Sequence, residues 1–125
     1  MDKAQALHEF WSSFGIKAFD ELSAYDKNMS LPDRYITYEV QTANFESPVG
    51  LTASLWYHST SWAEISQKAD QIAAYIGYGG KLLPVDGGYI WIKLGSPFAR
   101  RMSVEDDDSI RRIYINIAVE YLTAV

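Results

Sequence analysis

The sequence contains no cysteine, only four prolines and two histidines, and no long apolar run. The absence of cysteine excludes disulfides and thiolate metal ligands. No apolar stretch approaches the ~20 residues of a membrane-spanning helix, and no basic segment precedes an apolar block at the N-terminus. We therefore expect a soluble chain without a signal peptide. Basic residues are also in deficit, because 11 Lys and Arg against 16 Asp and Glu give a net charge of −5. This charge disfavours attraction of the whole molecule to nucleic-acid phosphates.

Patterns typical of catalysis or of metal binding are absent as well. His8 and His58 have no further ligands at metal-binding spacing. Residues 77–81 resemble a phosphate-binding loop only in their glycines, because a predicted helix precedes them and Leu82 stands where Ser or Thr is required. No serine lies in a nucleophile elbow. The sequence therefore predicts no catalytic residue, no metal site and no cofactor, and we expect a protein that is not an enzyme.

The most regular feature is the C-terminal stretch 110–123, in which apolar residues occupy every second position. Side chains of a strand alternate between two faces, so this pattern predicts a strand with one apolar face. The stretch is about twice the usual strand length of roughly 5 to 6 residues, which favours pairing with more than one neighbour. We expect it to be the central strand of a sheet. The apolar positions are Ile113, Ile115, Ile117, Val119 and Tyr121.

Two helices are predicted from apolar spacing and from residues that favour helix ends. Residues 2–14 carry a stripe of large apolar side chains, and Gly15 suits a C-terminal cap. The second helix is predicted to begin with a capping box formed by Ser61 and Glu64 and to end near Gly77.

The other predicted strands form two hairpins, Tyr35–Thr42 with Val49–His58 and Lys81–Val85 with Tyr89–Leu94. Pro84 indicates that its strand lies at an edge or carries a bulge. Residues 16–31, with a short helical turn at 18–23, and residues 95–109 are predicted connections. Residues 1–125 are thus expected to form one α+β domain. We expect a single antiparallel β-sheet with helices packed on one face, in the order α-β-β-α-β-β-β.

Aromatic residues are more numerous than a small core requires, with nine Tyr and four Trp. Five of them are predicted on the strand faces opposite the aliphatic residues, where Tyr and Trp would suit a surface that becomes buried. Two interpretations are open: the first helix covers this second face with its own aromatic residues, or another subunit does. The five are Tyr35, Trp56, Tyr89, Trp91 and Tyr114.

Charged residues near the C-terminus form a plus, minus, plus pattern. Arg100 and Arg101 precede the acidic run 105–108, and Arg111 and Arg112 follow it. The run lacks the ligand spacing of a calcium loop. It is either a solvated surface or, in a ring of copies, a complementary charge that sets the register of adjacent subunits.

From about Pro32 onward, the chain resembles small tail and neck proteins of siphophages and their prophages. The resemblance is carried by P-D-R-Y-I-T-Y, S-L-W-Y-H-S-T-S-W-A-E-I, D-G-G-Y-I-W-I-K-L-G-S-P-F-A-R-R-M and I-R-R-I-Y-I-N-I-A-V-E-Y-L-T. It is closest to the tail terminator or tail completion group, which includes minor capsid and neck proteins. The resemblance implies a small α+β fold that assembles into a hexameric ring.

By the same resemblance, the ring would cap the tail tube and join it to head-completion or connector proteins, with DNA only as passing cargo. The expected location is the virion tail or neck, and the host cytoplasm during assembly. No membrane partner is expected. The residues expected at subunit or partner interfaces are Phe45, Trp56, Trp91, Phe98, Arg100, Arg101, Asp106, Asp107, Asp108, Arg111 and Arg112.

A different class of function is a bacterial α+β module that binds a small ligand. In that alternative, the ligand lies between sheet and helix, and Trp56 and Trp91 line the pocket.

Overall fold

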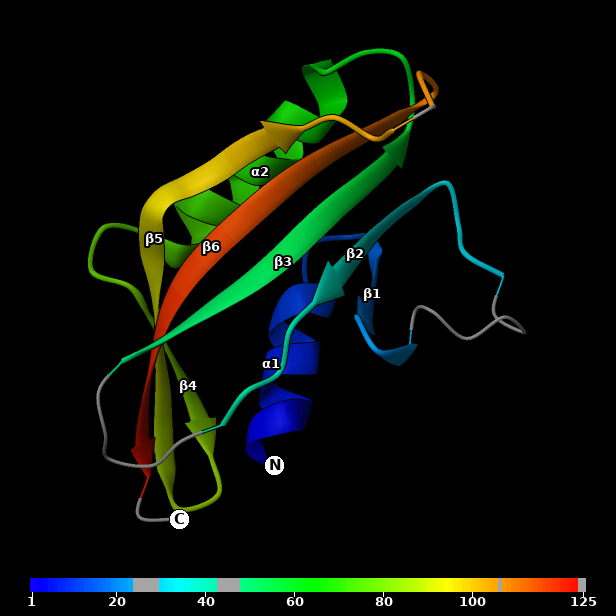
Figure 1. The fold of residues 1–125 in the computed structure, drawn as a ribbon. Coiled ribbons are helices and arrows are strands. Elements are labelled where there is room, and N and C mark those ends of the chain that lie inside the picture. The colour runs from blue at the N-terminus through cyan, green and yellow to red at the C-terminus, as the bar shows by residue number, and fades with distance from the viewer. Residues whose placement is uncertain (24–29, 43–47, 106, 124–125) are drawn as a thin grey trace.

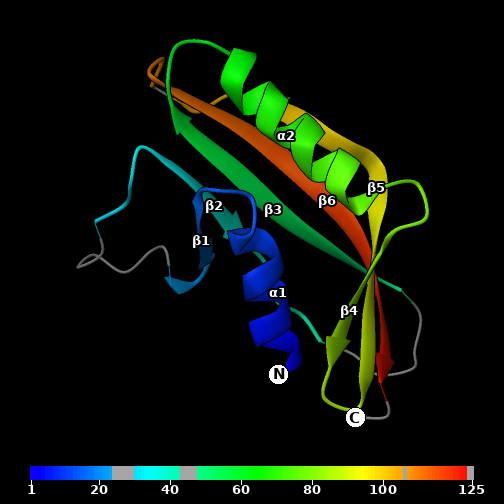
Figure 2. The ribbon, with the colours of Figure 1, turned by 180° about the vertical axis from the view of Figure 1, so that it is seen from behind.

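The computed structural model describes residues 1–23, 30–42, 48–105 and 107–123. These residues form two helices and a six-stranded sheet with strand order β1-β2-β3-β6-β5-β4. Both helices lie on the same side of the sheet (Figures 1 and 2). None of the described helices is long and apolar enough to span a membrane. In chain order the elements are α1 (Lys3–Ser12), β1 (Lys17–Asp20), β2 (Arg34–Tyr38), β3 (Val49–His58), α2 (Ala63–Ile76), β4 (Lys81–Val85), β5 (Gly88–Met102) and β6 (Ile110–Thr123).

Strand β6 is central, as its alternating sequence predicts. It pairs antiparallel with β3 along one edge and with β5 along the other. Its odd-numbered residues from Ile113 to Thr123 are buried, and the even-numbered residues between them are half-buried on the other face. The two predicted hairpins are also present, as β2 with β3 and β4 with β5.

The α+β class is confirmed, whereas the predicted antiparallel sheet and element order match only in part. Residues 17–20, predicted as part of a linker with a helical turn, form β1, and β1 pairs parallel to β2. The sheet is therefore mixed. Ala18 is buried opposite Ile36, whereas the remainder of this short strand shows no apolar alternation. A strand of four residues, whose pairing depends on a distant neighbour, leaves too little pattern for detection from sequence.

Strand β5 continues well past Leu94, where the sequence predicted the start of a long connection. An irregularity between Leu94 and Ala99 shifts the pairing with β6, after which the strand runs on to Met102. The side-chain amide of Asn116 donates a hydrogen bond to the carbonyl oxygen of Pro97 at 3.1 Å, across this irregularity. Glycine and proline weaken regular strands, so their presence correctly indicated an interruption of the β5–β6 pairing. The interruption is a bulge within β5 and does not end the strand.

The helix ends differ in part from prediction. Ser61 and Glu64 form no capping box, because Trp62 is the N-cap residue of α2 and makes no side-chain cap bond. The Glu64 carboxylate pairs with Arg34 instead. A capping box is present in α1, between Asp2 and Gln5. Helix α2 does end at Gly77, which has a positive φ of 74° and donates its N–H to the carbonyl of Ala73.

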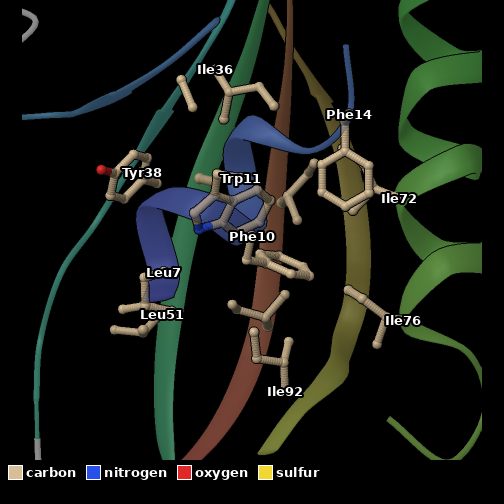
Figure 3. Packing of buried hydrophobic residues seen from close by; sticks show 14 of the residues in the cluster. Leu7, Phe10, Trp11, Phe14, Ile36, Tyr38, Leu51, Ile72, Ile76 and Ile92 are labelled. Carbon is tan, nitrogen blue, oxygen red and sulfur yellow. The ribbon is translucent and has the colours of Figure 1, made fainter. Parts of the chain in front are cut away.

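The core lies between the two helices and one face of the sheet (Figure 3). Helix α1 contributes Leu7, Phe10 and Trp11, and α2 contributes Ile72 and Ile76. Because the aromatic residues of α1 share this face with α2, they do not cover the opposite face. That interpretation of the sequence is therefore wrong.

Tyr121 gives the fold a predicted sensitivity to alkaline pH. Its buried hydroxyl donates a hydrogen bond to the carbonyl of Gln41. Burial raises the pKa of Tyr121 from 10.0 to about 12. Between these values the unfolded chain releases this proton while the folded chain keeps it. Stability is therefore complete below pH ~10 and falls as pH rises toward 12.

We expect Tyr121 alone to account for a loss on the order of 2 kcal/mol over that range. Urea unfolding at pH 9, 10 and 11 should show a shallower pH dependence for Tyr121→Phe than for the wild type. Tyr78→Phe, a change at an exposed ring, is the control and should keep the wild-type slope. Equal slopes for all three proteins would contradict the prediction.

Candidate functional site

We call the sheet face away from the helices the open face. It carries aromatic and arginine side chains in two adjacent rows that run across the strands. Strand pairing places Tyr35 opposite Trp56, and Trp56 opposite Arg112. In the adjacent row, Tyr114 lies opposite Arg100. We define the aromatic–arginine ladder as Phe19, Tyr35, Trp56, Arg112, Tyr114 and Arg100.

Rings and guanidinium groups in the ladder are in contact across five strands. The rings of Tyr35 and Trp56 are stacked, with centroids 6.1 Å apart and planes inclined by 13°. The guanidinium carbon of Arg112 lies 4.6 Å from the centroid of the Trp56 ring and 5.5 Å from that of Tyr114. Arg100 approaches the Tyr114 ring at 5.8 Å. Each cation–π contact of this kind contributes roughly 0.5–1 kcal/mol at an exposed site.

Two hydrogen bonds hold the centre of the ladder in place. The indole N–H of Trp56 donates to the Thr37 hydroxyl at 2.9 Å. The Nε–H of Arg112 donates to the hydroxyl of Ser54 at 3.1 Å. Ser54 is itself buried, so Arg112 is anchored at Nε. Within the described chain, neither Arg112 nor Arg100 has a carboxylate within ion-pair distance.

The four arginines of the predicted charge pattern are divided between the two faces. Before the bulge, odd-numbered residues of β5 such as Trp91 lie on the open face; after it, the even-numbered Arg100 does. The shift in register therefore reverses which residues face outward. It directs Arg101 to the helix side, where the guanidinium groups of Arg101 and Arg111 lie 4.9 and 5.4 Å from the Trp62 ring.

Arg111 is tied to the local backbone. It donates hydrogen bonds to the carbonyl oxygens of Thr60 and Asp108, each at 2.9 Å. Arg111 and Arg101 thus hold the start of α2 against the sheet, at the place where β5 ends and β6 begins. Arg100 and Arg112, by contrast, face outward on the ladder.

The acidic turn, defined as the described residues Glu105, Asp107 and Asp108, makes few contacts with the other residues that the structure describes. Asp107 accepts hydrogen bonds from the backbone N–H and the hydroxyl of Ser109. These bonds lower the pKa of Asp107. Glu105 and Asp108 are exposed, and no carboxylate of the turn's described residues pairs with an arginine. Asp106 lies outside the described residues.

The remaining predicted interface residues are dispersed. Trp91 is on the open face, but it lies opposite Glu120, whereas Trp56 lies opposite Arg112, eight residues away along β6. That separation is about 26 Å, so the two tryptophans do not line one pocket. Phe98 packs against the core, and Phe45 lies outside the described residues.

Trp91 is held by its own contacts. Its indole N–H donates to the carbonyl oxygen of Gly79 at 3.0 Å, and the Lys93 ammonium lies 3.7 Å from its ring centroid. Lys93 also pairs with Glu120 at 3.3 Å. The charges at this end of the open face are therefore satisfied within the chain, unlike those of the ladder.

A pocket lies on the helix side, between α1, the end of α2 and β4. Its volume is about 560 Å³, and its lining includes Phe10, Tyr75 and Leu83 together with the acidic residues Glu9 and Asp86. No group of three or more His, Asp or Glu able to hold a metal ion occurs among the residues that the structure places.

Phe19 is the member of the ladder that sequence reasoning did not find. Its ring meets that of Tyr35 edge-on, with centroids 6.1 Å apart. It belongs to β1, which the sequence pattern did not reveal. Its only sequence signal is an aromatic residue one position after a small apolar one.

Comparison of the chain with protein-family models and with curated proteins gives no match. We therefore infer the function from the open face and from the distribution of charge.

Proposed function

We propose that this chain is a structural subunit of a tailed phage or prophage that forms a ring at the head-proximal end of the tail. In this role of tail terminator or tail completion protein, it joins the tail tube to head-completion proteins. The observation that carries the proposal is the open face. In the described part of the chain, no element covers a surface on which aromatic and arginine side chains are aligned across five strands.

Such a surface has the composition of a protein interface. Tyr, Trp and Arg are enriched at interfaces and supply most of their energetic hot spots. Trp56 and Arg112 are already ordered by their hydrogen bonds to neighbouring strands, so binding would cost little side-chain entropy. A preorganised surface of this kind suits repeated contact between identical subunits.

The overall charge supports the same role. A net charge of −5 disfavours adhesion of duplex DNA, because the phosphates and the protein repel each other. A ring through which DNA passes requires this property. The location that follows is the virion neck or tail, and the host cytoplasm before assembly.

The proposal is tested by following assembly of the chain alone and with tail-tube protein added. We expect a defined oligomer in light scattering at high protein concentration, or rings at the ends of tail tubes in electron micrographs. Both arms are needed, because a subunit of this kind can stay monomeric until it meets its template. A chain that remains monomeric and never decorates tubes would refute the proposal. Portal, major tail and tape-measure genes beside this gene would support it.

A second candidate is the binding of a small apolar ligand. The pocket beside α1 favours it, since its volume of about 560 Å³ lies in the usual range for ligand sites. A screen of apolar metabolites by thermal shift tests this candidate. A ligand that raises Tm for the wild type but not for Tyr75→Ala would support it, and the absence of any such ligand would count against it.

A further inference from the structure

We propose that the aromatic–arginine ladder binds the acidic turn of a second copy of this chain. This inference rests on the proposed function, because it names the contact by which subunits recognise each other. The ladder supplies Arg100 and Arg112, and the turn of the neighbour supplies the carboxylates of Glu105 and Asp108. The contact is then a set of ion pairs formed across a stack of aromatic rings.

The ladder is built to bind carboxylates and not to stack nucleic-acid bases. Strand β3 lies between β2 and β6, so the Trp56 ring meets Tyr35 on one side and Arg112 on the other. No face of Trp56 is left for a base. The guanidinium carbons of Arg112 and Arg100 lie 4.6 and 5.8 Å from the centroids of the Trp56 and Tyr114 rings. The Nε–H of Arg112 is used by Ser54, whereas its terminal NH2 groups make no hydrogen bond to a described residue. Carboxylates bind the N–H groups of a guanidinium in a bidentate, charge-assisted manner.

The acidic turn of the same chain does not fill the ladder. Asp108 lies in the turn before β6, four residues before Arg112, and no described carboxylate of the turn lies within ion-pair distance of Arg100 or Arg112. An ion pair requires contact within about 4 Å. Accordingly, the contact between the turn and Arg111 uses the backbone carbonyl of Asp108 and not its carboxylate.

A second copy is the occupant that matches both sets of charges. Among the described residues of each chain, Arg100 and Arg112 have no carboxylate within ion-pair distance, and the exposed carboxylates of Glu105 and Asp108 have no cationic group within that distance. The ladder of each copy can therefore bind the acidic turn of one neighbouring copy, and its own turn can bind the ladder of another. No other protein is needed. A repeated one-way contact of this type between identical chains closes into a ring when its rotation permits.

The test uses two variants of the full chain with reversed charges. The ladder variant carries Arg100→Glu and Arg112→Glu, and the turn variant carries Glu105→Lys and Asp108→Lys. Asp107 is left unchanged because it holds the turn through Ser109. We expect each variant alone to self-associate at least ~30-fold more weakly than the wild type, and an equimolar mixture to recover most of that loss. Sedimentation velocity, with tail-tube protein present where it is needed, measures both effects.

The matched control is Arg101→Glu, the same charge change at the neighbouring position on the helix side. It should leave self-association within about threefold of the wild type, which is less than 1 kcal/mol. Far-UV circular dichroism of each variant confirms that it is folded. Raising the salt concentration should weaken the wild-type contact and leave a neutral contact unchanged.

The results separate failure of this inference from failure of the proposed function. Wild-type rings with undiminished assembly of the ladder variant would overturn the inference and leave the function standing. Loss of assembly in the ladder variant but not in the turn variant would overturn the choice of a second copy, and would point to an acidic partner of another kind. Micromolar binding of a labelled single-stranded oligonucleotide to the ladder would overturn the preference for carboxylates. A wild type that never assembles overturns both proposals.

Discussion

Replacing Trp11 with alanine is expected to lower the free energy of unfolding by about 3–5 kcal/mol, the usual cost of truncating a buried Trp. Trp11 is 1% exposed and lies between α1 and the sheet, beside Phe10 and Leu7 (Figure 3). Its ring meets that of Phe10 edge-on at 4.9 Å. Because α1 contacts the sheet through few such residues, the cavity would loosen the whole helix. Urea unfolding followed by circular dichroism measures the loss.

The control for Trp11 is Leu22→Ala, since Leu22 is 80% exposed. A surface substitution of this kind should change stability by less than ~0.5 kcal/mol. A domain of this size typically has a free energy of unfolding of about 5–15 kcal/mol. The Trp11 variant should therefore be only marginally stable at about 37 °C. A loss below 1 kcal/mol for Trp11→Ala would mean that α1 does not depend on this contact.

Replacing Gly88 with alanine is the second change with a large expected effect. Gly88 has a positive φ of 153°, and a Cβ there would lie 2.0 Å from the carbonyl oxygen of Leu122. Strain and steric overlap each cost roughly 1–3 kcal/mol, so a combined loss of about 2–6 kcal/mol is expected. The β4–β5 hairpin must move away from the end of β6. Hydrogen exchange should show loss of protection there, together with a lower urea midpoint.

Gly50→Ala is the control for Gly88, because a Cβ at Gly50 meets nothing within 4 Å. Gly50 lies in β3, where an alanine should be neutral or stabilising by about 0.5–1 kcal/mol. Equal effects of the two substitutions would show that the close approach of β5 to Leu122 is not a constraint.

The elements predicted well from sequence were those with a long, unbroken period. In β6, five apolar residues at every second position established both the strand and its buried face. In α2, Ile65, Ala69, Ile72 and Ile76 repeat with the helical period, and all four are buried. Apolar burial alone sets these patterns, so they do not depend on which strands are neighbours.

Features that depend on pairing between distant segments were missed. Strand β1 is too short to show a recognisable alternation of apolar residues. It forms by pairing with the edge of β2. The bulge in β5 cannot be distinguished from a loop by its Gly and Pro residues, yet it decides that Arg100 and not Arg101 lies on the open face. Local sequence does not encode this reversal, because it is a relation between two strands.

The candidate site shows the same division. Alternation correctly placed Trp56, Tyr114 and Trp91 opposite the aliphatic residues. It could not show that Trp56 touches Arg112 while Trp91 lies far away, because those distances follow from strand order and register. Only the folded chain therefore shows which of the predicted interface residues are neighbours.

The two outer strands of the sheet have a consequence for how copies can join. At one border β1 has only four residues, and at the other β4 carries Pro84, which has no N–H to donate. Short or proline-bearing borders resist the stacking of strands from different molecules into cross-β fibres. Copies of this chain are therefore expected to associate through the faces of their sheets and not by adding strands at the borders.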